Sequence, residues 1–328
     1  GGSRGSEVAE EMLGTNVNSI KELRDQLITL ANDIQQRNTN PAEKIIIYVD
    51  DLDRATLDDL KDFYLKWYGP NNAYLTISGD VTSEEVIPLV NKYFGSINKG
   101  SFVKRQRSNV PRLSSDKYCG YTDPNVWLPL IDMVFPTVPN YHKDEAALDI
   151  LASLMGDGNS SIFYKEFVKT EDAMQAMVAH PCRELSGEFH FQVLSFNPGM
   201  DFYENPGLFF NEVEGKIRNT ILKWEEQGFT DEELDMIKNE LISQTVDYKT
   251  SVMMKSTMIS RWEWLGRGRY NMSDEVKRYT DVTREDVMRV FNKYIKNRYA
   301  IISTVKPRSP FAKEKDSLVS FNPNANLI

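Results

Sequence analysis

The chain has 328 residues, of which 41% are hydrophobic and 27% charged, a composition typical of a folded globular protein with room for two domains. The formal net charge of −9, with lysines and arginines scattered along the chain, argues against a nucleic-acid partner. No run of about 18 apolar residues exists, so the sequence predicts no membrane span.

The sequence leaves the compartment open. No signal peptide is visible behind the opening residues GGSRGS, which we interpret as a flexible leader. The two cysteines, Cys119 and Cys182, can form one disulfide or stay free, so they do not decide between an oxidising and a reducing environment. A bacterial periplasm or cell envelope and the cytoplasm therefore both stay open.

The first predicted elements are a helix and an apolar strand that ends in aspartates. Residues 19–53 predict a capped amphipathic helix followed by IIIYVDD, and the acidic run continues to Leu60. A buried strand that ends in acid resembles the magnesium-binding strand of P-loop ATPases. Because the chain has no GxxxxGKS or GxxxxGKT motif to hold phosphates, nucleotide binding through this strand is kept only as a remote alternative.

Two segments repeat the same pattern about 227 residues apart. TLDDLKDFYLKWYGPNNAYLTI begins at Thr56 and TREDVMRVFNKYIKNRYAIIST begins at Thr283, and both open with Thr-x-x-Asp, a helix start that resembles a capping box. In each segment, apolar residues at helical spacing are followed by a short β-rich run, at Ala73–Ile77 and at Ala300–Val305. A repeat of this length is too large for a solenoid unit and indicates a duplicated domain.

Further helices and strands are predicted between the two copies. Thr82 and Thr230 each stand three residues before a glutamate and open capped helices. The other predicted elements are a strand at Trp127–Val138, a helix at Glu145–Met155, a strand at Glu188–Phe196 and a helix at Gly207–Gln227. The number of strands favours an α+β fold, in which helices pack on a sheet.

These segments resemble a known family of zinc peptidases. DLDRATLDDLKDFYLKWYGPNNAYLTISGDVTSEEVIPLVNKYFGSINKG resembles the end of the first domain of the M16 (insulinase, pitrilysin and processing-peptidase) family. LPLIDMVFPTVPNYHKDEAALDILASLMGDGNSSIFYKEFV, EEQGFTDEELDMIKNELI and YTDVTREDVMRVFNKYIKNRYAIISTVKP resemble its second, non-catalytic domain. The resemblance covers about residues 50–310. It implies the M16/LuxS-like metallohydrolase fold, a duplicated α+β domain with an antiparallel-rich sheet packed with helices, and a chamber that encloses peptides.

The resemblance also implies a division of the chain. Residues 1–50 would be a leader, helix and strand of uncertain origin, and residues 51–105 the C-terminal part of a first M16-type domain. The Pro- and Ser-containing stretch 106–115 would be a linker, and residues 116–310 the second domain. Residues 311–328 resemble the hinge that leads to a further half.

The catalytic motif of the family is not found in this sequence. Family members bind zinc through HxxEH, in which two histidines share one helix face and the glutamate activates water. The three histidines here, His142, His180 and His190, lie outside any such motif. We therefore expect no catalytic residue, no metal ligand and no cofactor in this chain, which should be inactive alone. Zinc is expected in the full-length protein or a partner.

A second family feature is an arginine and a tyrosine, seven residues apart, that hold the substrate. The resemblance aligns these positions with Val168 and Gln175, neither of which can supply the same groups. We therefore expect another M16 half or subunit to carry both HxxEH and the Arg/Tyr pair, with a peptide as the substrate.

One glycine-containing loop is a candidate for substrate contact. In the family the corresponding loop borders the chamber, and glycines leave backbone groups open to an extended peptide. The alternative is local: a glycine cap that ends the preceding helix, followed by a serine cap for the next. The two roles are compatible. The candidate residues are Gly156, Asp157, Gly158, Asn159, Ser160 and Ser161.

Two other clusters contain chemically versatile residues but indicate no site. His180 and Cys182, with His190 nearby, include soft metal ligands, but a structural zinc site needs four and we find no convincing fourth. Polar residues at strand edges are the favoured interpretation. Trp262 and Trp264, beside the RGR sequence, are interpreted as core or chamber wall.

The leading hypothesis is therefore the non-catalytic, substrate-chamber portion of an M16-type zinc peptidase. The main alternative is a catalytically inert M16-like scaffold or assembly subunit. The resemblance implies this alternative because the superfamily includes the core proteins of respiratory complexes, which have that role.

Overall fold

The computed structural model describes residues 57–106, 108–196, 199–247 and 250–307. The chain divides into two compact units, one made of Gly1–Leu75 with Asp80–Arg105 and the other of Thr76–Gly79 with Gln106–Ile328. The predicted helix and strand of residues 19–53, the nucleotide-binding alternative that rests on them, and the Thr56 cap lie outside the described residues.

The described part of the first unit consists of short helices. These are α2 (Leu57–Trp67), a 3-10 turn η1 (Pro70–Asn72) and α3 (Ser83–Phe94). The predicted cap at Thr82 is confirmed: the Glu85 N–H donates to the Thr82 hydroxyl and the Thr82 N–H donates to the Glu85 carboxylate. The helix continues through Pro88, which lacks the N–H for one helical hydrogen bond.

The first unit differs in two ways from a sheet with helices packed on it. Helices α2 and α3 leave apolar residues at the surface, since Phe63, Leu65 and Leu89 are more than half exposed. The run Ala73–Ile77 was expected to be β-rich and is not a strand. Both differences have one physical cause, because the described residues of this unit contain no strand for a helix to cover or for residues 73–77 to pair with.

The second unit is built on a five-stranded sheet with the order β1-β5-β2-β4-β3. The strands are β1 (Lys117–Asp123), β2 (Leu130–Thr137), β3 (Ala173–Ala179), β4 (Gly187–Ser195) and β5 (Ile301–Pro307). Only the β1–β5 pair is parallel; the other three pairs are antiparallel. This sheet confirms the α+β fold class with an antiparallel-rich sheet.

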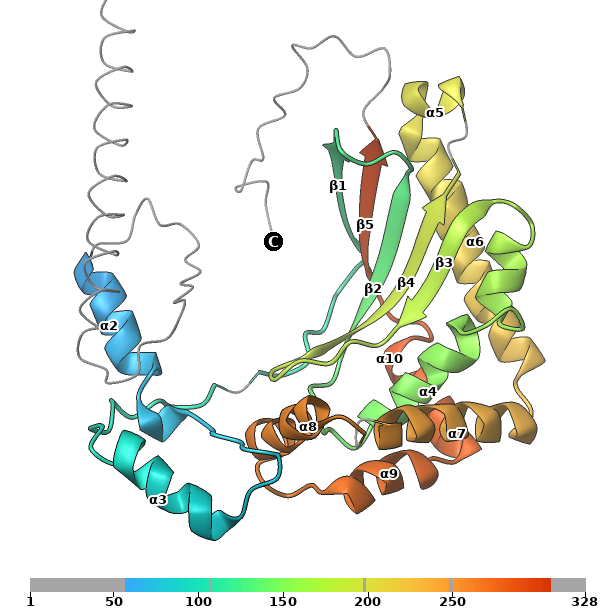
Figure 1. The fold of residues 1–328 in the computed structure, drawn as a ribbon. Coiled ribbons are helices and arrows are strands. Elements are labelled where there is room, and N and C mark those ends of the chain that lie inside the picture. Colours follow the sequence, from blue (N-terminus) through green and yellow to red (C-terminus); the bar gives the residue numbers. More distant parts are fainter. Residues whose placement is uncertain (1–56, 107, 197–198, 248–249, 308–328) are drawn as a thin grey trace, which may run out of the picture. The chain divides into compact units, whose positions relative to one another are not determined.

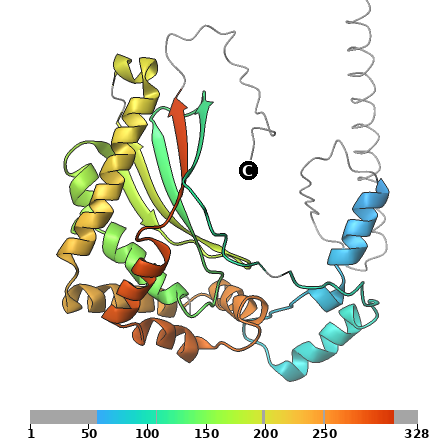
Figure 2. The ribbon, with the colours of Figure 1, turned by 180° about the vertical axis from the view of Figure 1, so that it is seen from behind.

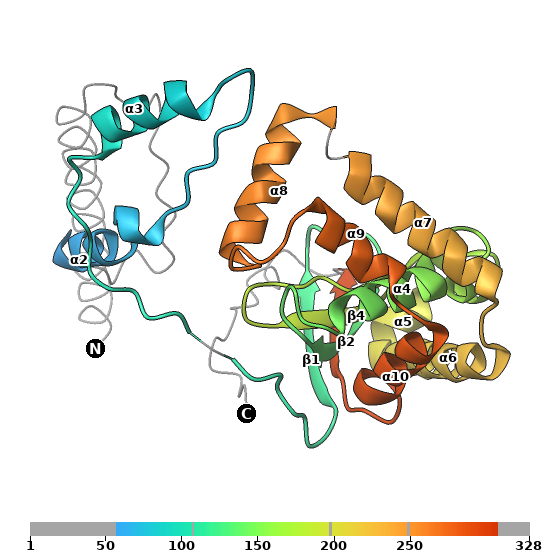
Figure 3. The same cartoon turned by 90° about the horizontal axis from the view of Figure 1, so that it is seen from below.

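Helices pack on one face of the sheet (Figures 1 and 2). Helices in contact with its strands include α4 (Glu145–Gly156), α6 (Pro206–Gln227) and α10 (Arg284–Tyr294). Figure 3 shows α7 (Asp231–Asp247) and α9 (Met272–Thr280) beside α4, with which both are in contact. The remaining described elements are the π-helical turn η2 (Tyr164–Val168), α5 (Met200–Glu204) and α8 (Val252–Trp264).

The core follows the alternation of the two central strands. On β4, Phe189, Phe191 and Val193 are fully buried, and the register sets Met133 of β2 opposite Phe191. Their neighbours in between are only partly buried, so the apolar residues face the helices and the others face away. The predicted alternation of the strand at Glu188–Phe196 is confirmed.

Helix α10 closes the helix layer and repeats α2 in sequence. The predicted capping box is present, because the Asp286 N–H donates to the Thr283 hydroxyl and the Thr283 N–H to the Asp286 carboxylate. Val287, Val290 and Phe291 are fully buried. Both α2 and α10 have 11 residues and occupy corresponding positions of the repeat. A duplicated domain stays a prediction, because the first unit's described residues form no sheet.

The predicted strand at Trp127–Val138 is confirmed from Leu130 onward, but its first residues are not part of it. Trp127 is 87% exposed and Pro129, which cannot donate a ladder hydrogen bond, precedes the strand. Both cysteines are free thiols, with Cys119 exposed and Cys182 partly buried. Among the described helices, none has the length and apolar character needed to cross a membrane.

Candidate functional site

The candidate glycine loop connects α4 to η2. Gly156 is the last residue of α4 and lies against β3, where a Cβ atom would come within 2.7 Å of the Val178 Cβ and 2.9 Å of its backbone nitrogen. Gly158 has a φ of +71°, a conformation that side-chain-bearing residues rarely adopt. At each of the two positions, the local backbone by itself explains why the residue is a glycine.

Ser161 begins the next helical segment. Its hydroxyl accepts a hydrogen bond from the Tyr164 N–H and donates one to the Gly158 carbonyl. The predicted serine cap is thus present, with Ser161 only 5% exposed. The four residues before it are different: Asp157, Gly158, Asn159 and Ser160 are all exposed. Local contacts hold the loop at both ends, and its middle residues are exposed. An extended ligand could therefore reach the backbone of the middle residues.

A small cavity adjoins this loop. Its volume is about 90 Å³, and Asp157 and Ser160 line it together with Lys165 and Glu233 from neighbouring helical segments. A space of this size holds a few water molecules or one small side chain. It contains both a cation and carboxylates and so offers polar partners of either sign.

The two positions aligned with the family's Arg/Tyr pair lie close to the loop along the chain. Val168 ends η2, and Gln175 is an exposed residue of β3, a strand at the edge of the sheet. Neither side chain carries a charge or a phenol. Direct substrate contact by the glycine loop and the loss of the Arg/Tyr functions both stay predictions.

The face of the sheet away from the helices carries a small charged cluster. His190 of β4 lies 3.0 Å from Asp132 of β2 through Nδ1 and 3.3 Å from Glu188 through Nε2. The hydrogen bond to Asp132, acting against burial, raises the pKa of His190 above its ordinary value. The histidine and Asp132 side chains are each 19% exposed. Polar and titratable groups are therefore accessible in the middle of this face.

The other conspicuous histidine lies on the opposite, helix-facing side. His180 contacts Asp149 of α4 at 2.6 Å through Nδ1, and its Nε2 lies 3.0 Å from the Thr137 hydroxyl and 3.6 Å from Cys182 Sγ. His180 and His190 thus point to different sides of the sheet. They cannot share a ligand.

The Cys182, His180 and Asp149 side chains follow the order of a nucleophile, base and orienting acid. The thiol, however, donates to the Val138 carbonyl, and burial, together with the charges of Glu145 and Asp149, raises its pKa well above the ordinary value. The His180 side chain is 1% exposed. A protonated thiol beside a buried imidazole supports structure and offers no nucleophile.

A zinc site does not fit the described residues. No group of three or more His, Cys, Asp or Glu side chains in this part of the chain is arranged to hold a metal ion. His180 and His190 already have carboxylate partners within 3.0 Å, and the Cys182 thiol is protonated. No catalytic step through zinc can be assigned to these residues.

The tryptophans flagged in the sequence separate into two environments. Trp262 is 9% exposed and its ring N–H donates to Glu275, whereas Trp264 is 47% exposed. Only the first is a core residue.

Sequence reasoning missed the Asp132–His190 pair. His190 was weighed as a metal ligand and interpreted as a polar residue at a strand edge, whereas it lies within β4, an interior strand of the sheet, and Asp132 was not singled out. A signal was present for His190, which alternates with the apolar residues of β4, but Asp132 is the one polar residue among Leu130, Val134 and Pro136 on its side of β2.

The chain is similar in sequence to known peptidases. A family model described as the peptidase M16 inactive domain matches residues 54–241, more than half of the chain. The zinc protease PqqE of Helicobacter pylori is 25% identical over 264 residues, which are 79% of this chain and 57% of the relative.

Solved structures share the fold. The crystal structure of a protease from Helicobacter pylori has a TM-score of 0.66 at 25% identity and is matched over 79% of this chain and 61% of that one. The crystal structure of a peptidase M16 inactive domain from Pseudomonas fluorescens has a TM-score of 0.61 at 16% identity, over 78% of this chain and 59% of that one. The present chain spans about three fifths of the length of these relatives.

Proposed function

Because this chain belongs to the M16 peptidase family and carries its inactive domain, we propose that its second unit forms a non-catalytic wall of a peptide-binding chamber. The membership confirms the resemblance seen in the sequence. The observation that carries the proposal is the division of the sheet into a buried face that the helices cover and a partly exposed face that no described helix of this unit covers. This open face carries polar side chains between apolar ones such as Val134 and Leu194, and it would turn toward the peptide.

The chemistry of that face suits an extended peptide. Asp132, Glu188, His190 and Gln192 offer donors and acceptors on adjacent positions of two paired strands. The glycine loop, Gly156–Ser161, would add an exposed backbone segment next to β3. Peptide binding by these two surfaces does not require a nucleophile or a metal in this chain.

Peptide cleavage would then depend on other parts of the assembly. Zinc would be held by an HxxEH motif in the full-length protein or a partner, and the Arg/Tyr pair would come from another M16 half or subunit. The exposed apolar faces of α2 and α3 support this part of the proposal, since helices with such faces are stabilised by packing against a sheet. We assign residues 51–105 to the end of a first M16-type domain, 106–115 to a linker and 116–310 to the second domain on the same basis.

Site-specific photo-crosslinking tests the proposal. A benzoylphenylalanine placed at Gln192 reports on the open sheet face, one at Ser160 reports on the loop, and one at Glu226, an exposed residue of α6, serves as the control on the helix side. After irradiation with a mixture of unfolded peptides, we expect adducts at Gln192 and Ser160 well above those at Glu226.

Equal labelling at all three positions would contradict the proposal, because it would show no preference for the proposed wall. An absence of adducts at Gln192 and Ser160 would favour the alternative of an inert M16-like assembly subunit.

A further inference from the structure

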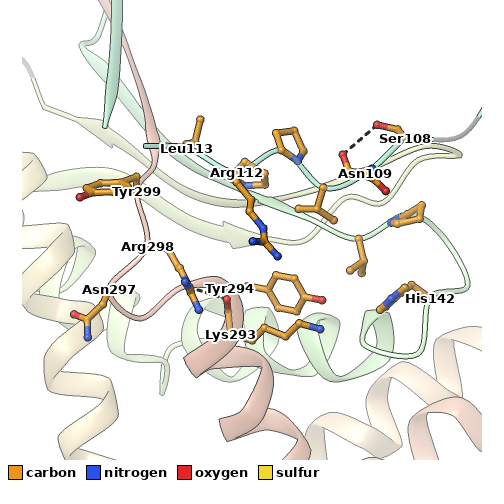
Figure 4. Close-up of a pocket in the computed structure, with 15 residues that line it drawn as sticks. Ser108, Asn109, Arg112, Leu113, His142, Lys293, Tyr294, Asn297, Arg298 and Tyr299 are labelled. Atoms are coloured by element: carbon orange, nitrogen blue, oxygen red, sulfur yellow. Dashed lines mark hydrogen bonds between the residues drawn. The ribbon is translucent and has the colours of Figure 1, made fainter. Parts of the chain in front are cut away.

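A second surface of the chain has the properties of a ligand site and lies apart from the glycine loop. It is a cavity of about 810 Å³ in the second unit (Figure 4). Its walls are residues 108–113, the end of β2 with the residues that follow it, and the turn from α10 to β5. Its volume lies in the range of about 300–1,000 Å³ that is usual for small-ligand sites. We refer to it as the cationic cavity.

The charged side chains that line the cationic cavity are all basic. Arg112 comes from one wall, and Lys293 and Arg298 come from the other (Figure 4). No aspartate or glutamate is among its described lining residues. This is notable in a chain with a formal net charge of −9, because it makes the cavity locally opposite in sign to the protein as a whole.

Two of these three cations retain binding capacity. The third, Lys293, is not available, because its Nζ forms an ion pair with the buried carboxylate of Asp144 at 2.8 Å. The Arg298 Nε donates to the Lys293 carbonyl, which leaves the terminal nitrogens of its guanidinium without a partner among the described residues. Arg112 is exposed and forms no ion pair with any residue in the described part of the chain. Guanidinium groups bind carboxylates through paired N–H donors.

The rest of the cavity is largely apolar. Val110, Pro111, Leu113 and Val138 line it together with the ring of Tyr294. Val110 also packs on the buried core, so this wall is anchored to the sheet unit. A ligand that fills the space must therefore join an anionic group to an apolar body.

The backbone of the wall adds a third feature. The N–H groups of Asn109, Val110, Arg112 and Leu113 donate no hydrogen bond to any described residue, and Pro111 has none to donate. The segment belongs to no helix or strand. An extended peptide can pair with such a segment as it would with a strand edge.

We propose that the cationic cavity binds the C-terminal end of an apolar peptide. Its terminal carboxylate would be held by Arg112 and Arg298, its side chains would contact the apolar wall, and its backbone would pair with residues 109–113. A free C-terminus brings a carboxylate, an apolar side chain and a peptide backbone together at one residue. The inference shares its ligand class with the proposed function but uses different residues.

Fluorescence anisotropy with the full 328-residue chain tests this site. The probe is an apolar pentapeptide labelled at its N-terminus, compared with the same peptide amidated at its C-terminus. We expect amidation to weaken binding about tenfold or more, because it removes the charge that the two arginines recognise. Arg112→Gln and Arg298→Gln should each weaken binding of the free acid by about fivefold to tenfold.

Lys277→Gln is the matched control. It removes one positive charge from an exposed position of α9 outside the cavity and should leave the Kd within about twofold. Unchanged thermal melting of all three variants establishes that they fold alike.

Three results would overturn the inference. The first is equal binding of the acid and the amide. The second is equal binding by the arginine variants and Lys277→Gln. The third is displacement of the peptide by inorganic phosphate at concentrations near the peptide's own Kd, which would make the cavity a general anion site.

The same assay separates this inference from the proposed function. If Gly158→Ala weakens binding while both arginine variants bind normally, the peptide occupies the chamber wall and the cationic cavity is not its site. If only the arginine variants bind the peptide more weakly, the cationic cavity is supported as its site, whatever the crosslinking result at the loop.

Discussion

The two faces of the five-stranded sheet come from the same strands, yet one is mostly apolar and closed, whereas the other is open and carries polar side chains among apolar ones. On the helix side, Phe189 and Phe191 are fully buried; on the other side, their neighbours Glu188, His190 and Gln192 remain partly accessible. The difference shows that a single alternating strand can hold the fold with one set of residues and leave the other set free for ligands. The following predictions test that division, from the largest effect to the smallest.

The helix side should carry most of the stability. Phe191→Ala leaves a cavity among Phe135, Phe163 and Phe189, whose rings all lie within 5.9 Å of it, and should lower the free energy of unfolding by about 3–5 kcal/mol. Urea denaturation measures the change. The matched variant is Gln192→Ala, one residue away on the open face, for which we expect a change within about 0.5 kcal/mol. Similar losses in both variants would contradict the division.

The helix layer depends on one buried carboxylate at the start of α4. Asp144 is fully buried and accepts hydrogen bonds from Arg289, Lys293 and Tyr294 of α10. Asp144→Ala should destabilise the protein by about 2–3 kcal/mol, because charge-assisted hydrogen bonds between two helices are lost. Asp281→Ala, which removes only an exposed 3.9 Å pair with Lys277, should have almost no effect.

The Asp144 effect should depend on pH. Burial alone would raise the pKa of Asp144, but the hydrogen bonds from Lys293, Tyr294 and Arg289 hold it well below its ordinary value. A carboxyl whose pKa is lowered by folding stabilises the protein above the unfolded value of about 3.9 and loses that contribution as the pH falls. The difference between wild type and Asp144→Ala should therefore be full at pH 6 and shrink in acid. A constant difference down to pH 2 would show that the charge is not its source.

The glycine loop should show a smaller, purely conformational effect. Gly158→Ala forces a side chain into a φ of +71°, which should cost about 1 kcal/mol of stability. Gly207→Ala in α6, where the added methyl group meets no atom within 4 Å and φ is ordinary, should be neutral or slightly stabilising. Thermal melting of the two variants side by side measures the contrast, and equal shifts would exclude strain at Gly158.

The open face should contribute least, with a pH dependence opposite to that of Asp144. The hydrogen bond to Asp132 raises the pKa of His190, so its stabilising contribution is present below the unfolded pKa of about 6.5 and is lost as the pH rises through the folded value. His190→Gln should cost about 1 kcal/mol at pH 5.5 and less at pH 8.5.

His142 provides the control for this titration. Burial lowers the pKa of His142, so its protonation in acid opposes folding and His142→Gln should remove a destabilisation at low pH. For each variant, the difference in melting temperature from wild type is measured from pH 5.5 to 8.5. The two differences should change in opposite directions as the pH rises. Parallel changes would mean that the Asp132–His190 pair is not the source of the effect.

Local rules predicted much of the fold. The Thr82, Thr230 and Thr283 caps are present as expected, since a side chain and a backbone N–H three residues apart decide them. The alternation of β4 likewise predicted its buried face, because successive residues of a strand point to opposite faces. The run at Ala73–Ile77 was wrong as a β-rich segment because a strand exists only with a partner, and pairing is not a local property.

Side chains that meet from distant segments could not be predicted in this way. The contact of His180 with Asp149 depends on how α4 crosses the sheet, and the pairing of Asp132 with His190 depends on strand register. The cationic cavity is a stronger case, because it joins Arg112, which was assigned to a linker, to Arg298, which was not singled out in the sequence. The glycine loop was located from the family resemblance, and its role in substrate contact still requires the crosslinking experiment.

The most direct test of the central claim is peptide turnover by this chain alone. The full 328-residue chain is incubated with zinc and a mixture of quenched fluorescent peptides, and the initial rate is measured. We expect no turnover above the rate with zinc alone, because the described residues contain no cluster that could hold a metal ion and the chain matches the inactive domain of the family, for which we propose a chamber-wall role. Zinc-dependent turnover that co-purifies with the chain and is abolished by chelation would contradict the claim.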